Sequence, residues 1–266
     1  STTAAPTSAP STTSTETPQL PGPEESWDLL FFGFDDLLTR LTAEMYAEHA
    51  ATALGVEVSM THPAGFDHLY ASNQLAMLRG ERFPPLDEAA RDAEIFVVLT
   101  RQDPVEEGPM SHINDDFLRC TWEIEAGDPP IERPADYWDP YREVMDDIYS
   151  EIRSLREGRP TVLISIDFHM LDLATLREAG IDESCIEWWS EWSDQIAETA
   201  SVNGSTMVSI FDRLNGPEHD MDPAALGLIG PTDQDPSIAD YRVNLAGATI
   251  IADALAAVGF EPATWP

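Results

Sequence analysis

Five short, almost continuously apolar runs alternate along this chain with longer stretches of helical periodicity. The runs cover residues 29–34, 56–60, 95–100, 161–166 and 207–211. Strands that are apolar on both faces suit a sheet covered on each side, so these runs predict five parallel strands. The periodic stretches predict helices over residues 38–54, 67–79, 86–92, 140–156, 187–201 and 243–258. We therefore expect an α/β protein, a three-layer α/β/α sandwich around a five-stranded parallel sheet.

The 266 residues divide into a leader and one domain. Residues 1–25 consist almost wholly of Ser, Thr, Ala and Pro, which offer too little apolar surface to offset chain entropy. They predict a disordered tether, followed by a folded domain over 26–266. Within the domain, residues 103–140 are too many for an ordinary strand-to-helix connection and predict an insertion or lid.

The charge balance excludes one large class of partners. The chain has 49 acidic and 14 basic residues, all 14 of them Arg, for a formal net charge of −35. A field of this sign repels nucleic acid and anionic membrane surfaces. No apolar run approaches the ~18 residues that a membrane-spanning helix needs. We expect no nucleic-acid partner and no transmembrane segment in this chain.

Export is expected from the Ser/Thr/Pro-rich leader and from a chain that begins at Ser1 without Met. The expected location is outside the cell or at its surface, and any lipoprotein anchor would lie upstream of Ser1. The two cysteines, Cys120 and Cys185, would then form one disulfide, with two buried thiols as the alternative. Their spacing is no metal-site signature.

A family resemblance rests on several segments. The opening residues 28–33, then 45–49 and 54–58, resemble bacterial SGNH/GDSL hydrolases, and residues 157–163, 185–189, 215–220 and the final helix resemble one secreted branch of that family. The resemblance covers about residues 28–262 and implies the flavodoxin-like SGNH hydrolase fold. It also implies esterase or lipase chemistry, in which a Ser after the first strand attacks an ester and a C-terminal His takes its proton.

The chain departs from that family at the positions that carry the chemistry. Gly33-Phe34-Asp35 stands where the family has Gly-Asp-Ser, so Asp35 replaces the nucleophile. Thr232-Asp233-Gln234-Asp235-Pro236 stands where it has Asp-x-x-His-Pro, so Asp235 replaces the histidine. The oxyanion-binding positions fall on Gly33, on Gly65, and on Gln102 or Asp103. Hydrolysis by the family mechanism is therefore expected to be lost.

The replacements bring several acids to one rim of the predicted sheet, namely Asp35, Asp36, Asp103, Asp233 and Asp235. If they converge, they could bind Ca²⁺ or Mg²⁺ through oxygen ligands; otherwise they are solvated loop residues and helix caps. No other cofactor is expected. His62 and His169 follow the second and fourth predicted strands and are the histidines best placed to face the cleft.

Other conspicuous residues have structural interpretations. Trp188 and Trp192 share one helical face and predict core packing. Tyr137, Trp138 and Tyr141 favour the same interpretation, although a pocket wall is the alternative. His219 lies in a segment typical of a tight loop rather than a metal site formed with Asp220 and Asp222.

Three functions remain open. The first is a catalytically degenerate relative that binds a small molecule, carbohydrate or acyl ligand, or serves in a surface assembly. The second is an active esterase or lipase with a rearranged site, in which a Ser outside the first block, such as Ser111, works with His62, His112 or His169. The third is a cation site at the Asp cluster.

Overall fold

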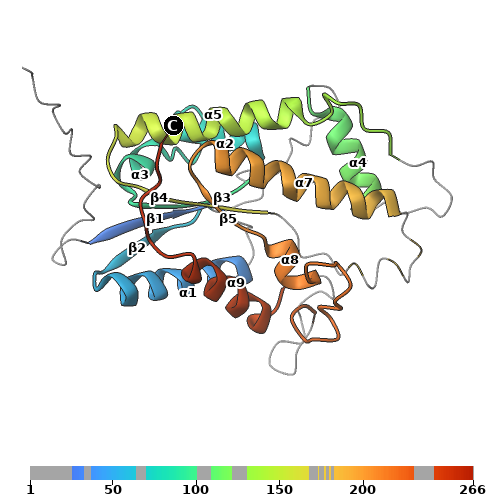
Figure 1. Ribbon diagram of the computed structural model, residues 1–266. Coiled ribbons are helices and arrows are strands. Elements are labelled where there is room, and N and C mark those ends of the chain that lie inside the picture. Colours follow the sequence, from blue (N-terminus) through green and yellow to red (C-terminus); the bar gives the residue numbers. More distant parts are fainter. Residues whose placement is uncertain are drawn as a thin grey trace, which may run out of the picture.

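A computed structural model shows the architecture of the chain (Figure 1). It describes residues 26–32, 37–63, 70–100, 109–121, 131–167, 173, 177, 180, 183–230 and 243–265, with the backbone alone at 37–39 and 121. The predicted tether, residues 1–25, lies outside the described residues.

All five predicted strands are present and pair in parallel. They are β1 (Trp27–Phe31), β2 (Val58–Thr61), β3 (Ile95–Leu99), β4 (Val162–Ile166) and β5 (Thr206–Val208). They form one sheet in the order β2-β1-β3-β4-β5. This is the flavodoxin-like strand order, and the direction of winding reverses between β1 and β3. The predicted fold class is confirmed.

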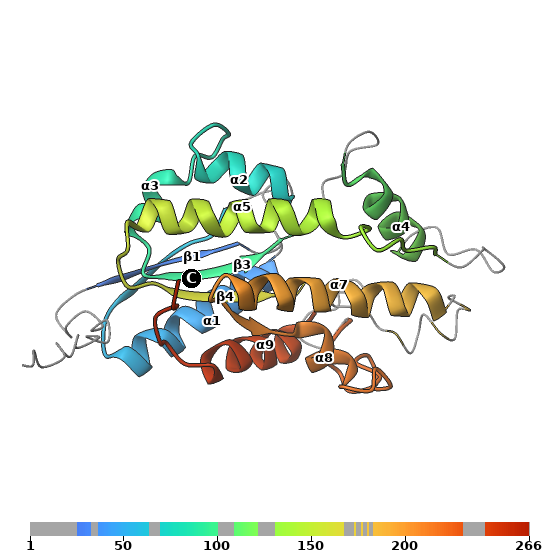
Figure 2. The ribbon, with the colours of Figure 1, turned by 45° about the horizontal axis from the view of Figure 1, so that its top comes forward.

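Helices cover both faces of the sheet (Figures 1 and 2). Those that fall in predicted helical stretches are α1 (Leu37–Leu54), α2 (Ala71–Leu78), α3 (Asp87–Asp92), α5 (Asp139–Arg156), α7 (Glu183–Val202) and α9 (Leu245–Ala257). In Figure 1 α2, α3, α5 and α7 lie on one side of the strands, and α1 and α9 lie on the other. None of these described helices is both long and apolar enough to cross a bilayer.

Alternate residues of each central strand feed two separate cores. In β3, Phe96 and Val98 pack with α2, α5 and α7, whereas Ile95, Val97 and Leu99 pack with α1 and α9. Successive side chains on a strand point to opposite faces, so a strand buried on both sides is apolar at nearly every position. This explains why the continuous apolar runs identified the strands.

The prediction of the fifth strand was wrong for the second half of its apolar run. The apolar run 207–211 spans the end of β5 and the beginning of α8 (Ile210–Asn215). Ser209 caps α8, because its Oγ accepts a hydrogen bond from the backbone N–H of Asp212 at 3.0 Å. The chain turns after Val208 because the cap and its partners satisfy the first N–H groups of the helix.

The predicted insertion, 103–140, contains a helix that the sequence analysis did not assign, α4 (Ser111–Thr121). The Cys120–Cys185 disulfide joins α4 to α7, which confirms the predicted pairing. A hydrogen-bonded chain also joins the two helices: Trp188 Nε1 donates to Tyr137 OH at 2.8 Å, and that hydroxyl donates to Asp116 Oδ2 at 2.6 Å.

Aromatic side chains fill the space between α4, α5 and α7. Trp188, Trp189 and Trp192 are fully buried, with ring centroids 4.7 to 5.5 Å apart. Trp138 and Tyr141 pack on Trp192 at 6.4 and 5.7 Å. The core interpretation of these rings is confirmed, because all of them are buried in one hydrophobic cluster.

The two ends of the described domain meet at the amino edge of the sheet. Trp27 begins β1, and its N–H donates to the carbonyl of Glu57 just before β2. At the other end, Ala263 N–H donates to the carbonyl of Thr161, the residue before β4, at 2.7 Å. The carboxyl ends of the strands point the opposite way, toward α4 and α8 in Figure 1.

Gly247, in the first turn of α9, permits a close approach of backbone. A Cβ at this position would lie 2.3 Å from the carbonyl oxygen of Leu228 and 2.8 Å from Val243 Cγ1. We expect Gly247→Ala to lower the free energy of unfolding by about 1–3 kcal/mol, despite the better helix propensity of Ala. Urea denaturation measures this, with the exposed Ala246→Ser as control; equal stability of the two variants would contradict the packing argument.

Candidate functional site

Ligands of open parallel sheets bind beyond the carboxyl ends of the strands, where the winding reverses. In this chain that point lies between β1 and β3. The described residues that reach it are Phe32 after β1 and Thr100 after β3, with His62 next to them after β2.

Most of the predicted site residues lie outside the described residues. They are Gly33, Asp35, Asp36, Gly65, Gln102, Asp103, His169, Thr232, Asp233 and Asp235. Their convergence, and the cation site that depends on it, remain predictions. The sheet order nevertheless shows where two of the loops start, because the segments after β1 and β3 leave from neighbouring strands at the switch point.

His62 is the one cleft histidine of the prediction that the structure describes. It directly follows β2, is half-buried, and its ring centroid lies 6.1 Å from that of Phe31. Because β2 pairs with β1, His62 lies at the carboxyl edge as predicted. His62 therefore lies next to the switch point, at the end of the edge strand β2.

A buried polar network occupies the end of β3. Gln74 Nε2 donates to the carbonyl of Leu99 at 2.5 Å, and Thr100 Oγ1 donates to Gln74 Oε1 at 2.8 Å. Tyr141 OH donates to the carbonyl of Thr100 at 3.0 Å, and burial raises the pKa of Tyr141. The Thr100 side chain is buried and its proton is engaged by an amide, so it is not arranged as a nucleophile.

Asp167, the residue after β4, accepts four hydrogen bonds, from α7 and from the segment that follows the neighbouring strand β5. Ser193 Oγ and Ser209 Oγ each donate to its Oδ2 at 2.6 Å. The backbone N–H groups of Ile210 and Phe211 donate to Oδ1 at 2.7 and 3.0 Å. One carboxylate therefore links β4, α7 and the first turn of α8.

The electrostatics of Asp167 reflect two opposing effects. The side chain is completely buried, and this burial raises the pKa of Asp167 above its usual value. Hydrogen bonds from the two serines and the two backbone N–H groups oppose the rise because they favour the charged form. All four donors belong to the protein, so Asp167 serves as a structural residue.

Three other described histidines have partners that are not hydroxyl groups. His49 Nε2 contacts Asp253 Oδ1 at 3.1 Å, and His219 Nε2 contacts Asp212 Oδ1 at 3.0 Å. His112 Nε2 donates to the carbonyl of Tyr137 at 2.8 Å, so this nitrogen carries the proton of the ring. The alternative in which His112 works with Ser111 stays a prediction.

The loop interpretation of His219 agrees with its geometry. His219 has a φ of 53° and its ring lies 4.5 Å from that of Phe211. Within the part of the chain that the structure describes, no group of three His, Cys, Asp or Glu side chains could hold a metal ion. That includes His219, Asp220 and Asp222.

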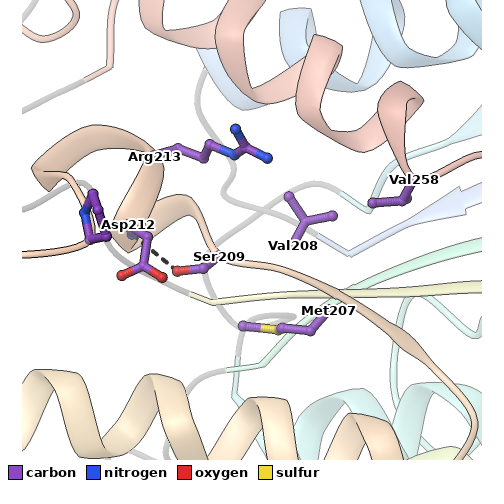
Figure 3. A pocket seen from close by; sticks show the side chains of 7 residues that line it. Met207, Val208, Ser209, Asp212, Arg213 and Val258 are labelled. Atoms are coloured by element: carbon purple, nitrogen blue, oxygen red, sulfur yellow. Dashed lines mark hydrogen bonds between the residues drawn. The ribbon is translucent and has the colours of Figure 1, made fainter.

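A pocket opens beside this network, between β5, α8 and the end of α9 (Figure 3). Its volume is about 320 Å³, and it is lined by Met207, Val208, Ser209, Asp212, Arg213, Pro217 and Val258. Figure 3 shows Arg213 extended from α8 toward α9, while Asp212 lies beside Ser209. The pocket combines an apolar wall with one cationic and one anionic side chain.

Neither the Asp167 network nor the pocket was predicted from the sequence. Asp167 could have been noticed as an acid directly after a strand that is buried along its whole length, a position where an uncompensated charge is costly. The pocket had no such signal, because α8 and the end of α9, about 45 residues apart in the chain, line it together.

Comparisons with known proteins do not assign this chain to a family. No family model matches the chain, and no curated protein matches it. Among solved structures, salicylyl-acyltransferase SsfX3 from a tetracycline biosynthetic pathway is similar with a TM-score of 0.46 and 15% sequence identity. The match covers 89% of this chain and 56% of that protein, so the chain spans little more than half of its length.

Proposed function

We propose that this chain is an exported SGNH/GDSL hydrolase-like protein that has lost ester cleavage and binds a small ligand at the carboxyl edge of its sheet. The observation that carries the proposal is the lack of a serine or cysteine nucleophile in the loops that leave the switch point. The ligand class is a small molecule, a carbohydrate or an acyl group, as the family resemblance implies.

The segments after β1 and β3 can be read directly from the sequence. Residues 33–36 are Gly-Phe-Asp-Asp, and residues 101–108 are Arg-Gln-Asp-Pro-Val-Glu-Glu-Gly, so neither contains Ser, Thr or Cys. The hydroxyl of Thr100 is buried and donates to Gln74. Cysteine chemistry is excluded as well, because both cysteines of the chain are in the disulfide.

The base is missing from its family position too. Asp235 stands where the resemblance places the histidine. An unperturbed Asp has a pKa of about 3.9 and an unperturbed His about 6.5, so a carboxylate is a far weaker base at neutral pH. Losing both nucleophile and base removes the two groups that a serine esterase depends on.

Two further observations support the proposal. The first concerns ligand binding and the second concerns a location outside the cytoplasm. The fold keeps its switch point, where sheets of this order hold ligands even when their chemistry differs. The disulfide between α4 and α7 is typical of proteins from oxidising compartments.

The test is an esterase assay paired with a covalent label. We expect the protein to hydrolyse p-nitrophenyl acetate and butyrate at the rate of the buffer, and to remain unlabelled by a fluorophosphonate probe. A serine esterase labelled in parallel controls for the probe. Labelling of any serine at stoichiometric level would overturn the proposal, and Ser111→Ala with His62→Gln would then show whether those two residues form the rearranged site.

A further inference from the structure

We propose that Asn203, directly after α7, is a deamidation site that makes a transient opening of the amino edge permanent. The co-reactant is water, and the product is Asp or isoaspartate at this position. Asn203 lies between the end of α7 and the start of β5, at the opposite pole from the switch point. The proposal is therefore independent of the proposed function.

The chain has two Asn-Gly pairs, Asn203-Gly204 and Asn215-Gly216. This dipeptide is prone to deamidation, because glycine has no side chain to hinder attack by its backbone nitrogen. The deprotonated glycine nitrogen bonds to the asparagine Cγ, the Cγ–Nδ2 bond breaks, and the amide leaves as ammonia. Water then opens the cyclic imide at either carbonyl, which gives Asp or isoaspartate.

The native fold holds Asn203 in a conformation that opposes this reaction. Its side chain is only 7% exposed, and Nδ2 donates to Asp146 Oδ1 at 2.7 Å and to the carbonyl of Thr199 at 2.9 Å. The attacking nitrogen is engaged as well, because Gly204 N–H donates to the carbonyl of Ser201 at 3.2 Å. Reaction therefore requires a local opening of this turn.

The C-terminal segment, residues 259–265, covers the turn. A Cβ on Gly204 would lie 2.3 Å from the carbonyl oxygen of Thr264, so the two backbones are in direct contact. Ala263 N–H donates to a backbone carbonyl before β4, and Ala263 and Trp265 pack against the core that α5 and α7 cover. Chain ends open at a lower free energy than core strands. Release of this segment is therefore the opening that frees Gly204.

Deamidation changes the contacts of position 203 so that the opening does not reverse. The new carboxylate has no N–H to donate, and it faces the carboxylate of Asp146 and the carbonyl of Thr199, which both repel it. Isoaspartate also adds one main-chain carbon next to Gly204, where the backbone of Thr264 is already in contact. Both products therefore keep the C-terminal segment from returning to its native position.

The second pair, Asn215-Gly216, is an internal reference. Asn215 is completely buried, and its Nδ2 donates to the carbonyl of Phe211 at 3.2 Å. Gly216 N–H donates to the carbonyl of Asp212 at 2.8 Å. This pair lies at the end of α8, far from the C-terminus in both views (Figures 1 and 2). Release of the C-terminal segment therefore leaves Asn215 protected.

Peptide mapping measures both sites in one digest. Trypsin cleaves after Arg213, which places Asn203 in the peptide 178–213 and Asn215 in the peptide 214–242. The full-length protein is incubated at mildly alkaline pH in heavy-oxygen water, with and without urea. After transfer to ordinary water it is reduced and digested, and mass spectrometry measures the incorporated heavy oxygen. We expect both sites to react at least about tenfold faster in urea than in the native protein.

Two variants loosen the C-terminal segment. Trp265→Ala removes a packed ring, and Ala263→Pro removes the N–H of a hydrogen bond. In at least one of them, reaction at Asn203 should rise at least about threefold while Asn215 keeps the parent rate. Phe83→Ala, which removes an exposed ring, is the control and should change neither rate. An unchanged ratio of the two rates in both variants, or native reaction at Asn203 as fast as in urea, would overturn the proposal.

Asn203→Asp tests the lasting effect of the modification. Ser201→Asp is the matched control, because it places the same charge at an exposed position at the same helix end. The amide hydrogen of Ser205, which donates to the carbonyl of Ala200 at 2.8 Å, should exchange at least about tenfold faster in Asn203→Asp than in Ser201→Asp. Equal exchange in the two variants would show that the new carboxylate does not keep the turn open, and this too would overturn the proposal.

Discussion

Asp167→Ala is expected to lower the free energy of unfolding by about 3–5 kcal/mol, because it removes a buried carboxylate and leaves its donors unsatisfied. The hydroxyls of Ser193 and Ser209 can rotate toward other acceptors, but the N–H groups of Ile210 and Phe211 cannot. The first turn of α8 should therefore loosen as well. Urea denaturation followed by circular dichroism gives the stability, and amide hydrogen exchange at residues 210–212 gives the local effect.

Asp167→Asn is the matched control for this result. An amide keeps one oxygen to accept from the two backbone N–H groups and nearly the same volume, so it should cost substantially less than Ala. Burial already favours the uncharged form of Asp167, which points in the same direction. If Ala and Asn destabilise equally, the hydrogen bonds to the backbone are not what holds this turn.

Removing the disulfide should have a similar effect on the whole fold. The bond closes a loop with a sequence separation of 65 residues, for which chain entropy gives about 4 kcal/mol of stabilisation. We expect the Cys120→Ala, Cys185→Ala double variant to lose about this amount in urea denaturation followed by tryptophan fluorescence. The buried rings of Trp188, Trp189 and Trp192 make fluorescence a sensitive probe of this region.

Reduction of the parent protein provides an independent comparison. The parent in excess reductant should denature at the same urea concentration as the double variant, while the oxidised parent denatures later. Identical curves for the oxidised and reduced parent would show that α4 is held by its aromatic contacts alone. Phe117 supplies such contacts, with ring centroids 5.6 Å from Trp189 and 6.3 Å from Trp192.

The fold could be predicted because its decisive interactions are repeated along each strand. β3 and β4 are buried at every position, and all of their residues are apolar except Ser165, whose hydroxyl is hydrogen-bonded to Tyr149 and Ser205. The end of β5 could not be predicted in this way. Ile210 and Phe211 continue the apolar run, and the residue that turns them into a helix, Asp167, is 43 residues away from Ile210.

The candidate site was predictable in chemistry but not in arrangement. The sequence places acids at Asp35 and Asp235, and this is enough to expect that the family mechanism is lost. That Arg213 and Val258 line one pocket depends on tertiary structure, which periodicity does not record. A charged residue becomes part of a site only through the segments that enclose it.

Both ends of the described domain lie at the amino edge of the sheet, and this decides which edge faces away from a point of attachment. Trp27 and Ala263 lie at the same pole, where β1 starts and where the final segment bonds to Thr161. If the domain is attached to a surface through the residues that precede Trp27, the carboxyl edge with α4 and α8 faces away from that surface, toward the solvent. A fusion partner attached just after the described C-terminal segment will likewise leave that edge accessible.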